Sequence, residues 1–236
     1  MFPLKDDVPT RTAPVVTVML ITLNVLVFLY QVSLRLDPDA PDVHEARQAA
    51  EAFVREFGLV PCQLAARCAT PLHALSPLLT VFTSMFLHGG PFHIAANMLY
   101  LWIFGHNVED TLGHVRFTLF YFASGVAAAV AQTWIDPGSG VPMIGASGAV
   151  SGVLGAYLLL FPGANVLVLM VFGFFWRVGR VPAILVLGLW IVVQIVTGLG
   201  ALGAGGGVAW FAHVSGFFAG MVLLFVLRPR FIRRRR

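Results

Sequence analysis

Charged residues are scarce in this chain: they make up 11% of its 236 residues, against about 25% in an average soluble domain. Cysteine is scarce as well, with two residues, so the chain is not a secreted scaffold held by disulfides. Hydrophobic residues make up 58% of the chain, and its mean hydropathy is +0.85. This composition leaves too little polar surface for a water-soluble globule and is far too apolar for a disordered chain. It predicts a membrane protein with about five to seven helices of ~20 residues each.

Long apolar runs divide the chain into helices that can each cross a membrane. We predict six spanning helices, over residues 14–34, 92–112, 117–135, 147–161, 183–199 and 208–227. A polar stretch over residues 35–91 forms a long outer loop between the first two helices. Residues 165–176 are apolar too, but about twelve residues are short for a spanning helix and more typical of an interfacial or re-entrant segment. The expected fold class is all-α, a polytopic membrane protein built as a six-helix bundle.

The distribution of basic residues predicts the orientation of the chain. With six spans and both termini inside, eleven of the fifteen basic residues face the cytoplasm and four lie outside, in agreement with the positive-inside rule. A seventh span at 165–176 would put the arginine-rich tail outside, so we exclude it. We expect a cytoplasmic N-terminus (1–13), a membrane domain (14–227) and a basic cytoplasmic tail (228–236). Because the tail directly follows an apolar run, it indicates contact with lipid headgroups and not with nucleic acid.

Both cysteines, Cys62 and Cys68, lie in the predicted outer loop. In an oxidising compartment they can form a disulfide that closes a short loop. Two unpaired thiols are the alternative, and the sequence leaves both open.

Few polar side chains lie at membrane depth, where such residues are expensive. Those that stand out are His93 and Asn97 in the second predicted helix, Glu109 at its inner end, Ser147 at the start of the fourth helix and His213 early in the sixth. The second, fourth and sixth helices all run from outside to inside. Their early residues therefore share one depth near the outer surface, which places all of these side chains except Glu109 in one layer.

The residue types in this layer suit nucleophilic catalysis. A serine hydroxyl is a weak nucleophile unless a neighbouring base takes its proton, and histidine is the usual base. No Asp or Glu is available at that depth, so a Ser147–His213 dyad fits better than a triad. His93, Asn97 and backbone N–H groups at the start of the fourth helix would donate to a developing oxyanion. The same residues also fit helix packing, or the polar core of a small transporter or channel.

Four short motifs occur in order along the chain. They are His93-Ile94-Ala95-Ala96-Asn97, the segment from Gly105 through Glu109 to Gly113, Gly145-Ala146-Ser147-Gly148, and Ala212-His213 followed by Gly216 and Gly220. These resemble the HxxxN, GxxxExxxG, GxSG and AHxxGxxxG motifs of the rhomboid intramembrane serine proteases. The resemblance covers residues 78–227 together with a first helix, and it implies a six-helix membrane domain.

The resemblance also implies roles for individual residues. Ser147 would be the nucleophile and His213 the general base, while His93 and Asn97, with the backbone N–H of Ser147, would form the oxyanion hole. Structural roles are implied for a further set: Glu109, His88 in the first outer loop, and the glycines Gly145, Gly148, Gly216 and Gly220. No metal or cofactor is implied.

The chain departs from the family pattern at two places. Some bacterial members carry Trp-Arg in the first loop where this chain has Leu79-Thr80, which affects how the loop is anchored. Some place an aromatic residue four positions after the serine to stack on the catalytic histidine, and here that position is Ser151. The orientation of His213 then falls to another group, for which the Ser151 hydroxyl is a candidate.

The sequence thus predicts an intramembrane serine endopeptidase that cleaves single-span membrane proteins near the outer face of the bilayer. Its partners would be those substrates and membrane lipid. The compact frame looks bacterial, which indicates the cell's inner membrane. The alternatives are a non-proteolytic relative that binds membrane proteins, and a small transporter or channel.

Overall fold

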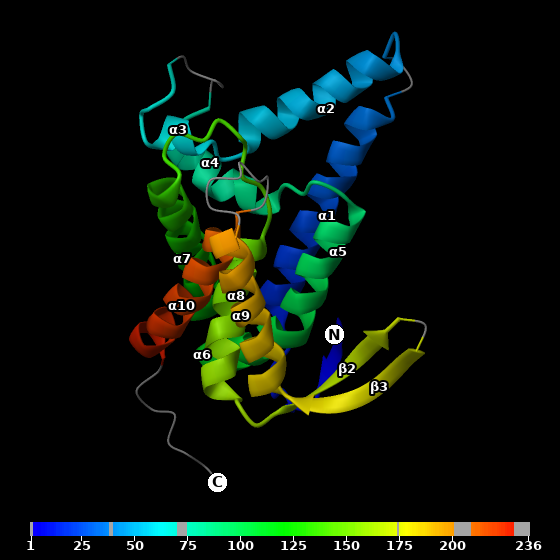
Figure 1. Cartoon of the computed structure of the whole chain (residues 1–236), viewed down its shortest axis with the longest axis vertical. Coiled ribbons are helices and arrows are strands. Elements are labelled where there is room, and N and C mark those ends of the chain that lie inside the picture. The colour runs from blue at the N-terminus through cyan, green and yellow to red at the C-terminus, as the bar shows by residue number, and fades with distance from the viewer. Residues whose placement is uncertain (1, 38–39, 70–74, 174, 201–208, 229–236) are drawn as a thin grey trace.

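The computed structural model describes residues 2–37, 40–69, 75–173, 175–200 and 209–228, and most of them are helical (Figure 1). The bundle helices are α1 (Val15–Arg35), α5 (Pro91–Tyr100), α6 (His106–Leu112), α7 (His114–Ile135), α8 (Ser147–Leu160), α9 (Ala183–Gly200) and α10 (Trp210–Leu227). A π-helical stretch, η2 (Leu101–Gly105), joins α5 to α6. Residues 91–112 therefore form one helical rod, as predicted.

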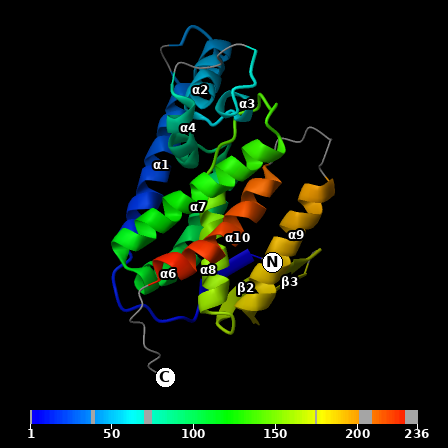
Figure 2. The same ribbon diagram turned by 90° about the vertical axis from the view of Figure 1, so that its left-hand side faces the viewer.

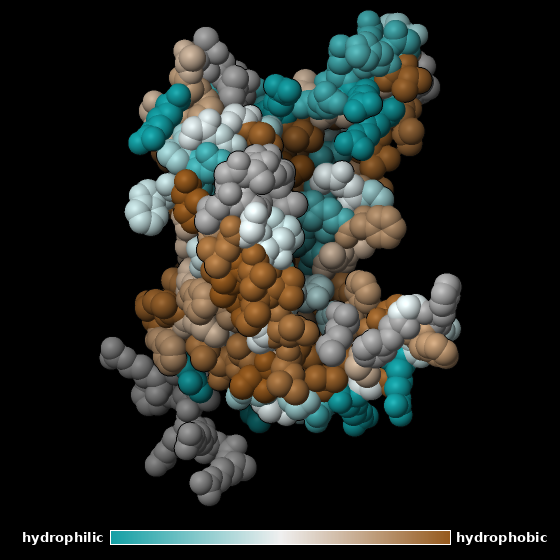
Figure 3. All heavy atoms as spheres, viewed as in Figure 1, coloured by the Kyte–Doolittle hydropathy of each residue, from teal (hydrophilic) through white to brown (hydrophobic). Residues whose placement is uncertain are grey.

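Among the described residues, four helices (α1, α7, α9 and α10) are long and apolar enough to cross a membrane. α8 is apolar but has 14 residues. On the face shown in Figure 3, hydrophobic side chains are concentrated over the middle and lower part of the bundle, and hydrophilic ones gather at the α2 end and along the lower edge. A mainly helical integral membrane protein is thereby confirmed, while the count of six spans stays a prediction. Residues 229–236 of the predicted basic tail lie outside the described residues.

Glycines set the distance between α8 and α10, which cross in the middle of the bundle (Figure 2). A Cβ atom on Gly216 would overlap the backbone carbonyl of Gly148, and one on Gly220 would overlap that of Gly152. Small residues of this kind let two membrane helices touch through their backbones. The contact brings the first turn of α10 next to the first turn of α8.

Glu109 of α6 serves as the N-terminal cap of α1. Its carboxylate is fully buried and accepts hydrogen bonds from the backbone N–H groups of Val16 and Thr17, both at 2.8 Å. It also accepts the Thr17 hydroxyl at 2.6 Å and lies 2.6 Å from Nδ1 of His114. The N–H groups of a first helical turn have no partner within the helix, and they favour negative charge. The carboxylate therefore ties the α6 end of the helical segment 91–112 to the start of α1.

The described part of the predicted outer loop, residues 35–37, 40–69 and 75–91, contains several short helices. It contains α2 (Val43–Phe57), α3 (Pro61–Leu64), α4 (Pro77–Thr83) and a short 3-10 turn, η1 (Ser84–Phe86). Phe53 of α2 packs edge-to-face on Tyr30 of α1, with ring centroids 5.2 Å apart. The Thr83 hydroxyl donates to the carbonyl of Phe57 at 2.6 Å and so connects α4 to the end of α2.

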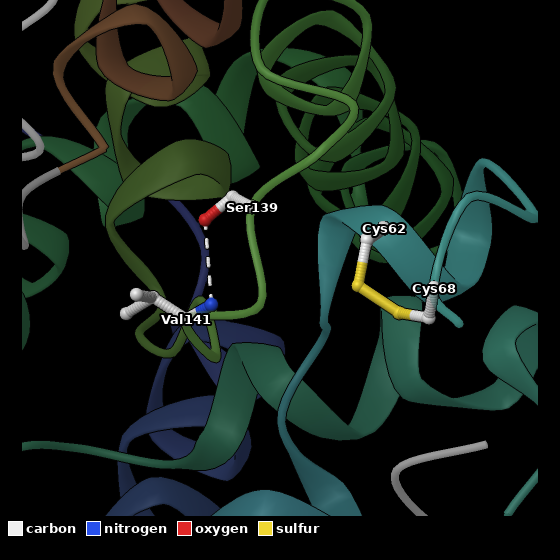
Figure 4. Close-up of a disulfide and its surroundings, with 4 residues drawn as sticks. All are labelled: Cys62, Cys68, Ser139 and Val141. Carbon is white, nitrogen blue, oxygen red and sulfur yellow. Dashed lines mark hydrogen bonds between the residues drawn. A yellow bond between two sulfur atoms is a disulfide. The ribbon is translucent and has the colours of Figure 1, made fainter. Parts of the chain in front are cut away.

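A disulfide joins Cys62 to Cys68 and closes a short loop beside the segment that leads into α8 (Figure 4). The backbone N–H of Cys62 donates to the carbonyl of Ser139 at 2.9 Å. Leu59 and Met143 exchange two backbone hydrogen bonds, of 3.1 and 2.7 Å. These bonds fasten the outer loop to residues 139–143, directly before the start of α8.

The fold also contains a three-stranded antiparallel sheet, which the sequence analysis did not predict. Its strands are β1 (Phe2–Asp6), β2 (Asn165–Phe172) and β3 (Phe175–Pro182), in the order β1-β2-β3. The stretch predicted as an interfacial or re-entrant segment is β2 and the start of β3. Val166 and Val168 face the core. Leu167 and Leu169, which alternate with them, are apolar as well, so no alternation of polar and apolar residues marks the strand.

The N-terminal strand is held by a buried carboxylate. Asp6 accepts hydrogen bonds from the Asn107 amide and the Tyr157 hydroxyl, both at 2.6 Å. Burial raises the pKa of Asp6, and its hydrogen bond from Tyr157 opposes that shift. The sheet lies at the end of the bundle opposite α2, and it connects the end of α8 to the start of α9 (Figure 1).

Candidate active site

Ser147 and His213 are hydrogen-bonded to each other. Ser147 is the first residue of α8, and His213 lies in the first turn of α10. The distance from Ser147 Oγ to His213 Nε2 is 2.9 Å, within the range in which a serine can pass its proton to an imidazole. The pair exists because Gly216, one turn after His213, rests on the backbone of Gly148.

The other nitrogen of His213 bonds to a residue that the sequence analysis missed. Nδ1 of His213 lies 2.8 Å from Oε1 of Gln194, on α9. An amide oxygen only accepts hydrogen bonds, so Nδ1 carries the hydrogen and Nε2 is left with its lone pair. This is the tautomer in which His213 can accept the proton of Ser147.

Ser151 does not orient His213. Its hydroxyl donates to the carbonyl of Ser147, one turn earlier in α8, at 2.6 Å. The candidate role given to Ser151 from the sequence is therefore wrong, and the described residue that bonds His213 Nδ1 is Gln194. A signal for Gln194 was present: it is the one polar side chain between Ala183 and Val196, and polar residues within spans are rarely placed without function.

His93 of α5 lies on the other side of Ser147. The backbone N–H of Gly89 donates to His93 Nδ1 at 3.3 Å, so the neutral ring carries its hydrogen on Nε2. Gly145 has φ +124°, and a Cβ atom built on it would lie 2.8 Å from His93 Nε2 and 3.5 Å from Ser147 Oγ. The missing side chain leaves a space next to both the Ser147 hydroxyl and a ring N–H donor.

Asn97 follows His93 by one helical turn. Its side-chain amide is buried and donates one hydrogen bond, to the carbonyl of His93 at 3.1 Å. An amide nitrogen has two hydrogens, so a second one is available. Asn97 and His93 line the same cavity as Ser147.

That cavity has a volume of about 540 Å³. It lies between α5, α8, α9, α10 and the segment before α8, and the polar side chains that line it include His93, Asn97, Gln132, Ser147, Gln194 and His213. The rings of Trp190 and Trp210 flank His213, with centroids 6.3 and 6.2 Å from its ring. The mixture of convergent polar groups and apolar walls is typical of a binding site for an organic substrate.

Two glutamines fix the elements around this cavity, and the sequence analysis missed both. Gln132 Oε1 accepts the backbone N–H of Ala212 at 3.1 Å, which holds the first turn of α10. Gln31 of α1 bonds the backbone of His88 twice: it accepts the N–H at 3.0 Å and donates to the carbonyl at 3.3 Å. In each case the side chain of a helical glutamine forms a hydrogen bond with a backbone group of a different segment, which would otherwise lack a partner.

His88 is buried behind His93, and its ring stands edge-on to the His93 ring with centroids 5.0 Å apart. Neither ring nitrogen of His88 has a hydrogen-bond partner among the described residues. Burial, and secondarily the neighbouring His93, lowers the pKa of His88 to about 4. His88 is therefore a neutral packing partner of His93 at neutral pH.

The structure thus gathers Ser147, His213, His93 and Asn97 around one cavity. Of the glycines predicted for support, Gly216 lies on the backbone of Gly148 and Gly220 on that of Gly152, while Gly145 lies beside His93. Glu109 does not reach the cavity and acts on α1 instead.

Comparison with known proteins adds a family match. The Rhomboid domain model matches residues 76–230. RHOMBOID-like protein 1 of Arabidopsis thaliana is 33% identical over 153 residues, which is 64% of this chain and 35% of that protein. Rhomboid protein 1, mitochondrial, of Saccharomyces cerevisiae is 36% identical over 38% of this chain and 27% of its own length. Rhomboid protease GluP of Bacillus subtilis is 42% identical over 33% of this chain and 15% of its own length. The matches thus span about a third or less of these relatives.

Proposed function

The chain belongs to the rhomboid family, and from this we propose that it is an intramembrane serine endopeptidase with Ser147 and His213 as its catalytic dyad. One observation carries the proposal: Ser147 Oγ lies 2.9 Å from His213 Nε2, while the opposite ring nitrogen is bonded to Gln194. This arrangement leaves the basic nitrogen aimed at the hydroxyl. A serine and a histidine that only packed two helices together would need neither a histidine with its hydrogen on Nδ1 nor a cavity beside them.

The proposed reaction has two halves. Ser147 Oγ attacks the carbonyl carbon of the scissile bond, and its proton passes to His213 Nε2. The C–N bond then breaks as His213 gives that proton to the leaving amine, and the acyl group stays bound to Ser147 Oγ as an ester. Water attacks the acyl-enzyme, passes a proton through His213 to Ser147 Oγ, and the carboxylic acid is released. Proton and bond counts balance with no further reactant.

The negative charge that develops on the carbonyl oxygen is placed in the space left by Gly145. His93 Nε2 borders this space, and its N–H would donate a hydrogen bond to the oxyanion. The further donors to the oxyanion would be the backbone N–H of Ser147 and the Asn97 amide. The N-terminal end of α8 also favours negative charge there. Removal of one such donor from a serine hydrolase costs on the order of 100-fold or more in kcat.

The position of the cavity favours substrates that enter from the outer side of the membrane. α8 and α10 both begin at the end of the bundle that faces α2 and the outer loop (Figure 1). The basic residues of the chain favour this end as the outer one, with both termini in the cytoplasm. We therefore propose cleavage of single-span membrane proteins near the outer surface, in the inner membrane of a bacterial cell.

The test uses purified protein in detergent with a fluorescent single-span reporter, and compares wild type, Ser147→Ala and His213→Ala. We expect cleavage by the wild type alone. A fluorophosphonate probe should label the wild-type protein on Ser147 and should fail to label either variant. Cleavage by Ser147→Ala at the wild-type rate would contradict the assignment. Absence of both cleavage and labelling in the wild type would favour a non-proteolytic relative or a transporter.

A further inference from the structure

Gln194 is a buried amide in an otherwise apolar part of α9. Its side chain is 8% exposed, and within the described residues it makes a single hydrogen bond, to His213 Nδ1. A buried amide costs free energy unless its polar atoms are bonded. An apolar residue at this position would stabilise α9 in a membrane more than glutamine does. We therefore look for the role of the glutamine in its hydrogen bond with His213.

We propose that Gln194 is the positioning residue of the catalytic histidine: it holds the imidazole in the Nδ1–H tautomer and at the angle that serves Ser147. The inference rests on the proposed serine protease function and deepens it. The site then consists of a serine, a histidine and a neutral acceptor contributed by three helices, α8, α10 and α9. No carboxylate is needed for this task, because the amide oxygen alone determines which ring nitrogen carries the hydrogen.

Other contacts of His213 do not set its tautomer. The indole rings of Trp190 and Trp210 pack against the His213 ring and limit its tilt. They offer no conventional hydrogen-bond acceptor to either ring nitrogen. Without Gln194, the neutral ring can carry its hydrogen on Nε2, where it donates to Ser147 Oγ and cannot take its proton. A share of the molecules would then be inactive in every turnover.

The experiment compares wild type with Gln194→Leu and Gln194→Glu in detergent, with kcat, KM and the rate of fluorophosphonate labelling of Ser147 as readouts. Gln194→Leu removes the acceptor and puts an apolar side chain of similar volume in its place. We expect kcat and the labelling rate to fall together by about 10- to 100-fold, the scale for a misoriented catalytic group, with KM within about twofold. Gln194→Glu keeps an acceptor at the same place and should restore most of both rates.

Thr197→Val is the matched control, because Thr197 is the next polar side chain of α9 and its hydroxyl bonds only its own helix, at the carbonyl of Val193. We expect wild-type kcat in this variant. Thermal unfolding of each variant shows whether the bundle is intact, and if Gln194→Leu is destabilised, Gln194→Asn replaces it, since its shorter side chain keeps the polarity and withdraws the oxygen from His213.

Full activity and labelling in a variant without an acceptor would overturn the role of Gln194 while leaving the serine protease assignment in place. A rise in KM with unchanged kcat would overturn it as well, because it would make Gln194 a substrate contact. A wild-type protein that neither cleaves nor labels would overturn the proposed function itself, and the two failures are therefore distinguishable.

Discussion

Gly216 of α10 lies directly on the backbone carbonyl of Gly148 of α8, closer than any side chain would permit. His213 lies three residues before Gly216, which is just under one helical turn, and Ser147 lies directly before Gly148. The separation between the two catalytic candidates is therefore set by a contact between backbones. Small changes at this contact should affect activity before they unfold the protein.

Gly216→Ala tests this relationship. The added Cβ must push α10 away from α8, so the Ser147–His213 hydrogen bond of 2.9 Å lengthens. A displacement of about 1 Å at a catalytic pair can cost on the order of 100-fold in rate. We expect kcat to fall by about that factor in the reporter assay, with thermal unfolding shifted downward.

Gly188→Ala is its control. Gly188 is also within a helix of the bundle, α9, but a Cβ on it meets nothing within 4 Å. Alanine has the higher helix propensity, so this variant should be at least as stable as the wild type and equally active. Equal activity of both variants would mean that α8 and α10 can separate without harm to the site.

Gly145→Ala tests the space proposed for the oxyanion. The new methyl group would lie 2.8 Å from His93 Nε2 and would occupy the position of the carbonyl oxygen. A φ of +124° is also a backbone conformation that alanine rarely adopts. We expect loss of cleavage by about 100-fold or more, on the scale of a lost oxyanion donor. Gly140→Ala, in the same segment with open space around it, should retain activity.

The sequence was sufficient to find four polar residues that the structure gathers around one cavity, Ser147, His213, His93 and Asn97, because each lies in a motif at the same depth of its helix. Ser147 and His213 are 66 residues apart, yet the alternation of spans predicts that their helices run in the same direction. The hydrogen bond between them then needs only the glycine contact, which the spacing of Gly216 and Gly220 also indicates.

Gln194 stands out in the sequence as a lone polar residue, but its partner His213 could not be assigned from the sequence. An apolar helix such as α9 has no polar face that would show which side turns inward, so its rotation about its axis is set by packing. The residues of β2 escaped prediction for a related reason: both faces of that strand are apolar, and its pattern has no period of two. In each case the sequence does not show which face of the element turns toward the core, because that is set by tertiary contacts.

Glu109→Gln should destabilise the protein more than it affects catalysis. The carboxylate accepts hydrogen bonds from two backbone N–H groups and a hydroxyl in the first turn of α1. A hydrogen bond to a charged group contributes about 1.5–3 kcal/mol to stability. The amide offers one acceptor oxygen and turns its NH₂ toward a donor. We expect a loss of about 3–5 kcal/mol in unfolding free energy, the range for removing one partner of a buried ionic contact.

Thermal unfolding in detergent measures this loss, and the reporter assay at low temperature measures the activity that remains. Asp110→Asn is the matched control: Asp110 accepts the backbone N–H of Thr12 at 2.8 Å, but at an exposed position. Its effect should be less than half that of Glu109→Gln. A Glu109→Gln protein as stable as the wild type would show that the first turn of α1 needs no charged cap.

His88 predicts how stability depends on pH. Its pKa is lowered to about 4 in the folded protein, mainly by burial, against 6.5 for an ordinary histidine. Between these values the unfolded chain binds a proton at this residue and the folded protein does not. The unfolding free energy therefore rises with pH over this window and falls on acidification from 6.5 to about 4, by up to about 3 kcal/mol from this group.

The measurement is the unfolding temperature in detergent at pH 7 and pH 5, for wild type and for His88→Leu. Leucine fills the space without a titratable group and removes two ring nitrogens that have no partner among the described residues. The acid-dependent decrease should therefore be smaller in the variant, and at pH 5 the variant should gain on the wild type. Parallel pH dependence of the two proteins would show that His88 reaches water when it takes up its proton, and that its burial beside His93 is not maintained in acid.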